Sequence, residues 1–126
     1  MTLEVDVRHR LGAFQLDVRF RSDAGVTALF GRSGAGKTSI VNAISGLIRP
    51  EHGRIVISGA VMFNSERGVF LPKHQRRIGY VFQEGRLFPH LTVRQNLLYG
   101  RWFAPNASRR ERPDLVLDLL GIESLL

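Results

Sequence analysis

Apolar and polar side chains alternate at the start of the chain. The apolar ones occupy every second position in two short runs: Val5 and Val7, then Phe14, Leu16, Val18 and Phe20. A period of two is typical of strands with one buried face, and Gly12 between the runs can supply a turn. We therefore predict two strands joined at Gly12, with Phe14 in the core.

Further segments have the composition of strands. Val26–Phe30 is a short apolar run without alternation. Such a run is typical of a strand covered on both faces, as in a parallel sheet. Ile78–Phe82 is predicted as another short strand, which ends at Gln83. The stretch Gly53–Met62 is predicted as a hairpin.

Helical spacing follows a glycine-rich segment that begins at Gly31. Five apolar residues fall on one helical face: Ile40, Val41, Ile44, Leu47 and Ile48. Pro50 is expected to end this helix, because proline cannot continue it. The polar and basic stretch Glu66–Arg77 and the stretch Arg86–Leu91 are predicted to be irregular.

A second helix is predicted from its first turn. Thr92 and Gln95 have the spacing of a capping box, in which each side chain binds the other residue's backbone N–H. The helix is expected to run through Leu98 and to end at Gly100. The stretch Trp102–Arg112 is predicted to be a loop.

Length and composition exclude several classes of protein. The 126 residues correspond to about one domain. The 44% of hydrophobic residues argues against disorder, and the absence of cysteine excludes disulfide scaffolds and cysteine zinc sites. No run approaches the roughly 18 apolar residues of a membrane span. Charges occupy the place of a signal peptide's apolar region. We expect a soluble, cytoplasmic chain.

The formal net charge of +7 does not identify a partner by itself. Lys37 and Lys73 are the only lysines, and the arginines are spread from Arg8 to Arg112 rather than gathered in one block. We therefore expect no nucleic-acid partner. Arg76 and Arg77 are expected to be solvated. The four histidines lack the spacing of metal ligands.

One motif carries specific chemistry. The segment Gly31-Arg32-Ser33-Gly34-Ala35-Gly36-Lys37-Thr38 matches the phosphate-loop pattern G-x-x-x-x-G-K-[ST]. Glycines let successive backbone N–H groups point at a phosphate, and the following helix adds its positive end. Lys37 supplies a charge to the β- and γ-oxygens, and the Thr38 hydroxyl can ligate Mg²⁺. We predict a nucleotide phosphate site.

Other residues narrow the choice among phosphate-loop proteins. A guanine-specific Asn-Lys-x-Asp motif is absent, because His74 follows the one lysine outside the loop. Gln83 stands at the end of a predicted strand, where ligands gather in parallel sheets, and its amide can orient water or complete a Mg²⁺ shell. A small-molecule kinase remains open at this point.

Longer matches resemble the nucleotide-binding domain of ABC transporters over nearly the whole chain. They comprise the phosphate loop with Ile44-Ser45-Gly46-Leu47-Ile48-Arg49-Pro50 and Gly53-Arg54-Ile55 after it, then Arg76-Arg77-Ile78-Gly79-Tyr80-Val81-Phe82-Gln83-Glu84 and Leu87-Phe88-Pro89-His90-Leu91-Thr92-Val93. Within the family, Asn42-Ala43-Ile44-Ser45-Gly46-Leu47 and Arg86-Leu87-Phe88-Pro89-His90 resemble the ATPase subunits of molybdate importers most.

The resemblance implies an α/β fold of the P-loop NTPase class with an antiparallel β subdomain. It also implies ATP hydrolysis that energises molybdate uptake at the cytoplasmic face of the inner membrane, by a peripheral subunit. ATP would be bound by Gly31, Arg32, Ser33, Gly34, Ala35, Gly36, Lys37, Thr38 and Ser39. Lys37 and Gln83 would act in catalysis, and Thr38 and Gln83 would hold Mg²⁺. A membrane permease would dock on Glu84–Leu91, and a second ATP-binding subunit would complete the site.

The sequence departs from the family pattern in its last third. The signature Leu-Ser-Gly-Gly-Gln/Glu, a Walker B run ending in Asp-Glu and a switch histidine are missing. Leu115–Asp118 is a faint Walker B candidate, but Pro113 before it and Gly121 after it favour a helix over Asp114–Leu120. No adenine-stacking residue is assigned among His9, Leu11 and Phe14.

We therefore expect residues 1–126 to form the N-terminal part of an ABC-type ATP-binding domain, without the helical subdomain and the Walker B half. Such a chain should bind MgATP weakly and hydrolyse it poorly or not at all. The alternatives are a non-catalytic nucleotide-binding remnant, a small-molecule kinase, or the ATPase of a sulfate, phosphate, polyamine or sugar importer.

Overall fold

The alternating residues at the start of the chain form a β-hairpin in the computed structural model, which describes residues 1–103 and 113–125. Strands β1 (Leu3–Leu11) and β2 (Phe14–Ser22) pair antiparallel, with Leu11 opposite Phe14. Gly12 forms the turn with φ 62°. The predicted hairpin is confirmed.

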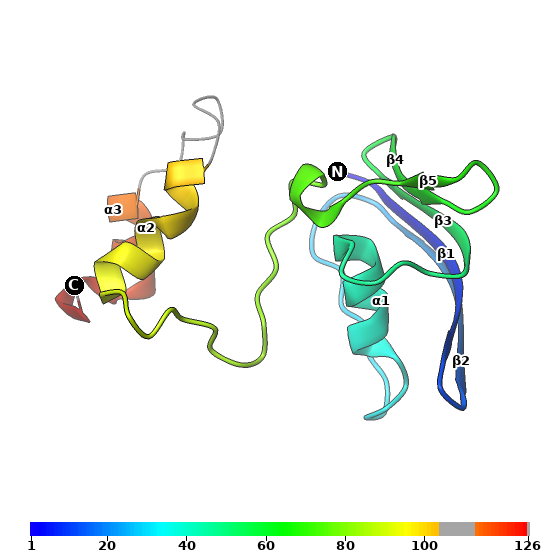
Figure 1. Ribbon diagram of the computed structural model, residues 1–126, viewed down its shortest axis with the longest axis horizontal. Coiled ribbons are helices and arrows are strands. Elements are labelled where there is room, and N and C mark those ends of the chain that lie inside the picture. Colours follow the sequence, from blue (N-terminus) through cyan, green and yellow to red (C-terminus); the bar gives the residue numbers. More distant parts are fainter. Residues whose placement is uncertain (104–112, 126) are drawn as a thin grey trace. The chain divides into compact units, whose positions relative to one another are not determined.

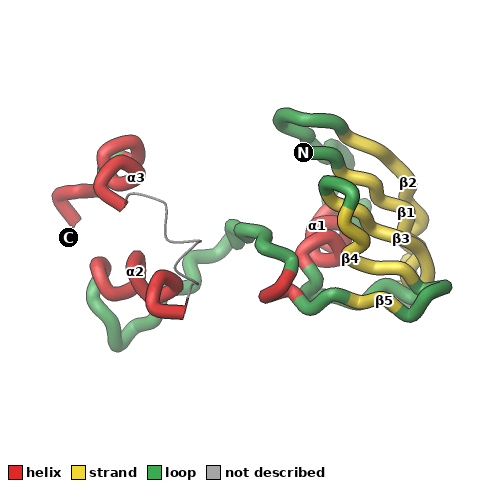
Figure 2. The backbone as a smooth tube through the Cα atoms, turned by 90° about the horizontal axis from the view of Figure 1, so that it is seen from above, coloured by secondary structure: helices red, strands yellow, loops and turns green. Residues whose placement is uncertain are grey.

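Three more strands extend this hairpin into one antiparallel sheet. Strands β3 (His52–Ile57) and β4 (Ala60–Asn64) form the second predicted hairpin, and β5 (Val69–Phe70) lies beside β4. The strand order is β2-β1-β3-β4-β5 (Figures 1 and 2). Strand β5 and a short 3-10 helix (Lys73–Gln75) lie in the stretch that we predicted to be irregular.

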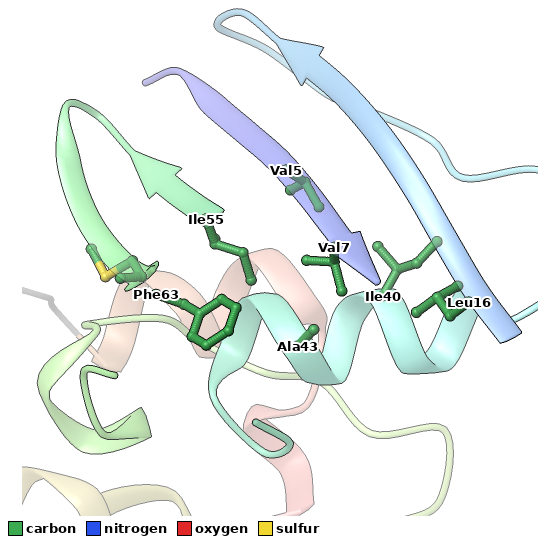
Figure 3. Close-up of a cluster of buried hydrophobic side chains, with 8 residues drawn as sticks. Val5, Val7, Leu16, Ile40, Ala43, Ile55 and Phe63 are labelled. Carbon is green, nitrogen blue, oxygen red and sulfur yellow. The ribbon is translucent and has the colours of Figure 1, made fainter. Parts of the chain in front are cut away.

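Helix α1 (Lys37–Ser45) packs its apolar side on one face of the sheet. The buried cluster joins both layers and consists of Val5, Val7, Leu16, Ile40, Ala43, Ile55, Met62 and Phe63 (Figure 3). Burying each large apolar side chain contributes about 1.5–3 kcal/mol, so this cluster holds α1 against the sheet.

Helix α1 ends earlier than predicted. Gly46 adopts φ 87°, and its N–H and that of Leu47 donate to the carbonyl of Asn42. This left-handed C-cap satisfies the last carbonyls of the helix, which ends at Ser45. Pro50 lies five residues further along the chain. Leu47 and Ile48 therefore lie outside the helix, and the prediction that Pro50 ends it is wrong.

The two strands predicted for a parallel sheet are also wrong. Neither Val26–Phe30 nor Ile78–Phe82 is a strand of the described structure. Val26 and Phe30 are fully exposed, and Val81 is 97% exposed. A strand exists through hydrogen bonds to a neighbouring strand, so apolar composition alone does not produce one.

A second unit begins at Val81. It contains α2 (Val93–Phe103), α3 (Pro113–Leu120) and a 3-10 helix (Glu123–Leu125). No helix in the described part of the chain is long and apolar enough to span a membrane.

The start of α2 was predicted correctly and its end was not. The capping box is formed: the N–H of Gln95 donates to Thr92 Oγ1 over 3.2 Å, and the N–H of Thr92 donates to Gln95 Oε1 over 2.9 Å. The helix then continues through Gly100 and includes Trp102 and Phe103. A glycine inside a helix costs only about 1 kcal/mol, so it does not stop one by itself. The rest of the predicted loop, residues 104–112, lies outside the described residues.

Candidate phosphate-binding site

Residues 31–36 form an exposed loop that leads directly into α1. Its tight turn is closed by the N–H of Ala35, which donates to the carbonyl of Arg32 over 3.1 Å. Gly34 and Gly36 have φ 82° and 92°, in the left-handed region that favours glycine. Ser33 and its two neighbours on the C-terminal side are exposed. The loop therefore presents its backbone to solvent.

The first turn of α1 has the character of an anion-binding end. Gly36 is the N-cap, no side chain caps the helix, and the first turn holds no acidic residue. The first N–H groups of a helix lack intrahelical acceptors, and the helix dipole is positive there. Thr38 is exposed and Ser39 is half-buried in this turn. The polar groups expected to bind phosphate thus lie together from Gly31 to Ser39.

The ammonium of Lys37 folds back over the start of the loop. Lys37 Nζ donates to the carbonyl of Gly31 and, over 3.1 Å, to the carbonyl of Arg32. No carboxylate neutralises it in the described residues, where the ion pairs join only Glu4 or Asp23 to arginines. A phosphate oxygen is a stronger, charged acceptor than either carbonyl. The donors of this loop therefore fit a polyphosphate.

Side chains of strand β2 lie close to Gly36 of the loop. A Cβ placed on Gly36 would lie 3.0 Å from Leu16 Cδ1 and 3.1 Å from Phe14 Cε1. The backbone conformation therefore favours glycine at this position, and a Cβ there would require the Leu16 and Phe14 side chains to shift by a few tenths of an ångström. Phe14 is 41% exposed, so its predicted place in the core is wrong. The first position of a strand faces solvent at the hairpin end, where only part of the ring is covered.

Sequence analysis missed the role of Arg76. We expected it to be solvated, but it is only 3% exposed. Its Nη1 donates to the carbonyls of Ala43 (2.9 Å) and Ile44 (3.0 Å) at the end of α1. Burial lowers the pKa of the guanidinium through desolvation. A single buried arginine produces no periodic sequence pattern from which its burial could be predicted. Its only signal was the glycine at position 46, which makes room for it.

Comparison with known proteins identifies the family of this loop and helix. The model of a protein family described as ABC transporter matches residues 16–126. The chain belongs to the ABC transporter family.

Individual relatives within the ABC transporter family are similar over the whole chain. It is 61% identical over 126 residues to the molybdenum import ATP-binding protein ModC of Rhizobium etli. Proteins of the same name from Rhizobium meliloti and Rhodospirillum rubrum are 57% and 56% identical over 126 and 124 residues. These matches cover 100%, 100% and 98% of this chain but 36%, 35% and 34% of the relatives. The chain thus spans about a third of the length of the curated relatives it matches.

The remaining predicted residues of this ABC transporter chain lie in the second unit. Gln83 occupies a bend and is exposed, as is the following stretch up to His90. Leu115–Asp118, the faint Walker B candidate, lies on helix α3, in agreement with the helical prediction. In the described part of the chain, no three side chains of the metal-binding types lie close enough to hold an ion.

Proposed function

We propose that this chain binds ATP with Mg²⁺ at Gly31–Ser39 and is the N-terminal part of the ATP-binding domain of a molybdate importer. One observation carries the proposal of a nucleotide site. The Lys37 ammonium closes a glycine loop at the free N-terminal end of a helix, and no carboxylate in the described residues neutralises it. The family match and the printed names of the relatives support the choice of ATP and of molybdate.

Each group of the loop has a role in this proposal. Backbone N–H groups of Gly34 and of Gly36 to Ser39 bind the β-phosphate, and Lys37 leaves its carbonyl acceptors to bind the β- and γ-oxygens. The Thr38 hydroxyl and the Gln83 amide hold Mg²⁺, which neutralises phosphate charge when bound. Gln83 also orients the attacking water. Hydrolysis in the whole protein requires a carboxylate that this chain does not supply.

The partners follow from the same proposal. A membrane permease binds the region Glu84–Leu91, which is exposed over most of its length. A second ATP-binding subunit faces the phosphate loop. The protein would then act as a peripheral subunit at the cytoplasmic face of the inner membrane.

Calorimetric titration of the chain with MgATP tests the nucleotide site. Lys37→Ala removes charge-assisted hydrogen bonds of about 1.5–3 kcal/mol, so affinity should fall about 10- to 150-fold. Lys73→Ala is the matched control, because Lys73 is the other lysine, exposed in the short 3-10 helix. It should leave affinity unchanged. Equal affinity of the Lys37→Ala and unsubstituted chains would refute the site.

The transported ion is tested separately. The full-length gene should restore molybdate uptake in a strain without its own molybdate importer. Restored uptake of sulfate, phosphate, polyamine or sugar with no molybdate uptake would instead identify another importer.

A further inference from the structure

Arg76 is a buried cation with no carboxylate partner among the described residues. It is 3% exposed, and it takes part in none of the ion pairs of the described residues. Its Nη2 is buried without a hydrogen-bond partner. Burial lowers its pKa, so the charged form is destabilised by desolvation. A cation in such a place must be held by other contacts.

Carbonyl oxygens and an aromatic ring replace the missing carboxylate. Arg76 Nε donates to the carbonyl of Leu71 over 2.6 Å, and Nη1 donates to the carbonyls of Ala43 and Ile44. The last two carbonyls belong to the C-terminal end of α1, where the helix dipole is negative. The ring of Phe70 lies 5.0 Å from the guanidinium carbon, within cation–π range.

Tyr80 makes a second connection to the same helix turn. Its hydroxyl forms a 2.7 Å hydrogen bond with Oδ1 of Asn42. Arg76 and Tyr80 thus bind three consecutive residues of α1, positions 42 to 44. The helix end is shaped for this contact, because a Cβ on Gly46 would lie 2.9 Å from Arg76 Nε and 3.1 Å from the Cα of Lys73.

These contacts join the segment Arg76–Tyr80 to the end of helix α1 within the first unit. Helix α1 begins at Lys37 of the phosphate loop, and Gln83 follows Tyr80 by three residues. We propose that Arg76 and Tyr80 are positioning residues, which fix the segment leading to Gln83 on the phosphate-loop helix. The inference rests on the proposed function, because it assigns Gln83 to the Mg²⁺ of bound ATP.

A double-mutant cycle in the purified chain tests this role. The quantity measured is the ratio of the ATP dissociation constants without and with Mg²⁺, by calorimetry. Gln83→Ala should lower this ratio. Arg76→Met and Tyr80→Phe should each lower it about 2- to 10-fold, the size expected for a lost hydrogen bond. Either change combined with Gln83→Ala should lower the ratio no further than Gln83→Ala alone.

A purely structural role gives a different result. If the losses multiply in the double variants, Arg76 and Tyr80 act independently of Gln83 and the positioning role is refuted. Arg77→Met is the matched control, since Arg77 is an exposed neighbour that loses the same charge, and its ratio should not change. Thermal unfolding shows which variants are folded. Should Arg76→Met fail to fold, Tyr80→Phe, which removes only one hydroxyl, decides the cycle.

Two outcomes separate this inference from the proposed function. No binding of MgATP by the folded, unsubstituted chain refutes the nucleotide site and the positioning role together. Binding of MgATP with unchanged ratios for Arg76→Met and Tyr80→Phe leaves the nucleotide site intact and refutes the positioning role alone.

Discussion

At the scale of single residues, Gly36 joins the phosphate loop to the core. Its φ of 92° strains any other residue, and a Cβ there would lie only 3.0 Å from Leu16 and 3.1 Å from Phe14. Gly36→Ala should therefore destabilise the chain by about 1–2 kcal/mol for the backbone conformation, and further for the contact. Urea unfolding followed by circular dichroism measures the change.

Gly34→Ala separates the two causes. Gly34 has φ 82°, and nothing lies within 4 Å of a Cβ placed there. It should show the backbone part of the loss without the packing part. Equal destabilisation by both substitutions would mean that Phe14 and Leu16 do not constrain the loop.

At the scale of elements, Asn96 of α2 organises the loop that precedes the helix. Its Oδ1 accepts the N–H of Phe88 over 2.7 Å, and its Nδ2 donates to the carbonyls of Phe88, Leu91 and Thr92 over 3.2, 3.3 and 2.9 Å. The Phe88 ring lies 4.5 Å from that of Tyr99 on the same helix. One amide therefore holds both ends of the loop Phe88–Thr92, which overlaps the region proposed to bind the permease.

Asn96→Asp should release this loop. The substitution is nearly isosteric, but a carboxylate oxygen takes the place of the Nδ2 donor and faces three carbonyl oxygens, which repel it. Amide exchange at Phe88, measured by NMR, should become about tenfold faster or more. Gln95→Glu adds the same charge one position earlier and keeps its accepted bond from Thr92, so it should leave exchange unchanged. An unchanged rate of amide exchange at Phe88 in Asn96→Asp would show that the loop keeps its structure without the hydrogen bonds of Asn96.

At the scale of the whole molecule, two apolar segments lack strand partners. Val26–Phe30 and Ile78–Phe82 are not strands in the described structure, although Val26, Phe30 and Val81 are almost fully exposed. Exposed apolar segments with the composition of strands associate with other chains. We expect the 126-residue chain to form larger species as its concentration rises, as measured by sedimentation velocity.

Phe30→Lys should reduce this association. Leu119→Lys is the control, because Leu119 is also exposed (85%) but lies on α3, where helix hydrogen bonds satisfy the backbone. It should reduce association less. A monodisperse monomer of the unsubstituted chain with a sharp, cooperative melt would contradict the expectation.

Local signals in the sequence determined much of this protein. Alternation predicted β1 and β2, the capping box predicted the start of α2, and Pro113 and Gly121 bounded α3 correctly. The phosphate-loop pattern predicted a loop followed by a helix. These features depend on residues within a few positions of one another, so their physical causes are present in the sequence itself.

Contacts between distant residues decided the rest. Arg76 lies more than thirty positions from two of the three carbonyls that hold it, and no local pattern distinguishes it from its exposed neighbour Arg77. Gly46 ends α1 before Pro50 through its left-handed C-cap, and the lack of a side chain there leaves room for that arginine. Val26–Phe30 has the composition of a strand but no partner in the described structure. The hydrophobic periodicity of the sequence determines which face of a helix or strand is apolar. Only the tertiary structure determines which residues pack against that face and which groups accept or donate its hydrogen bonds.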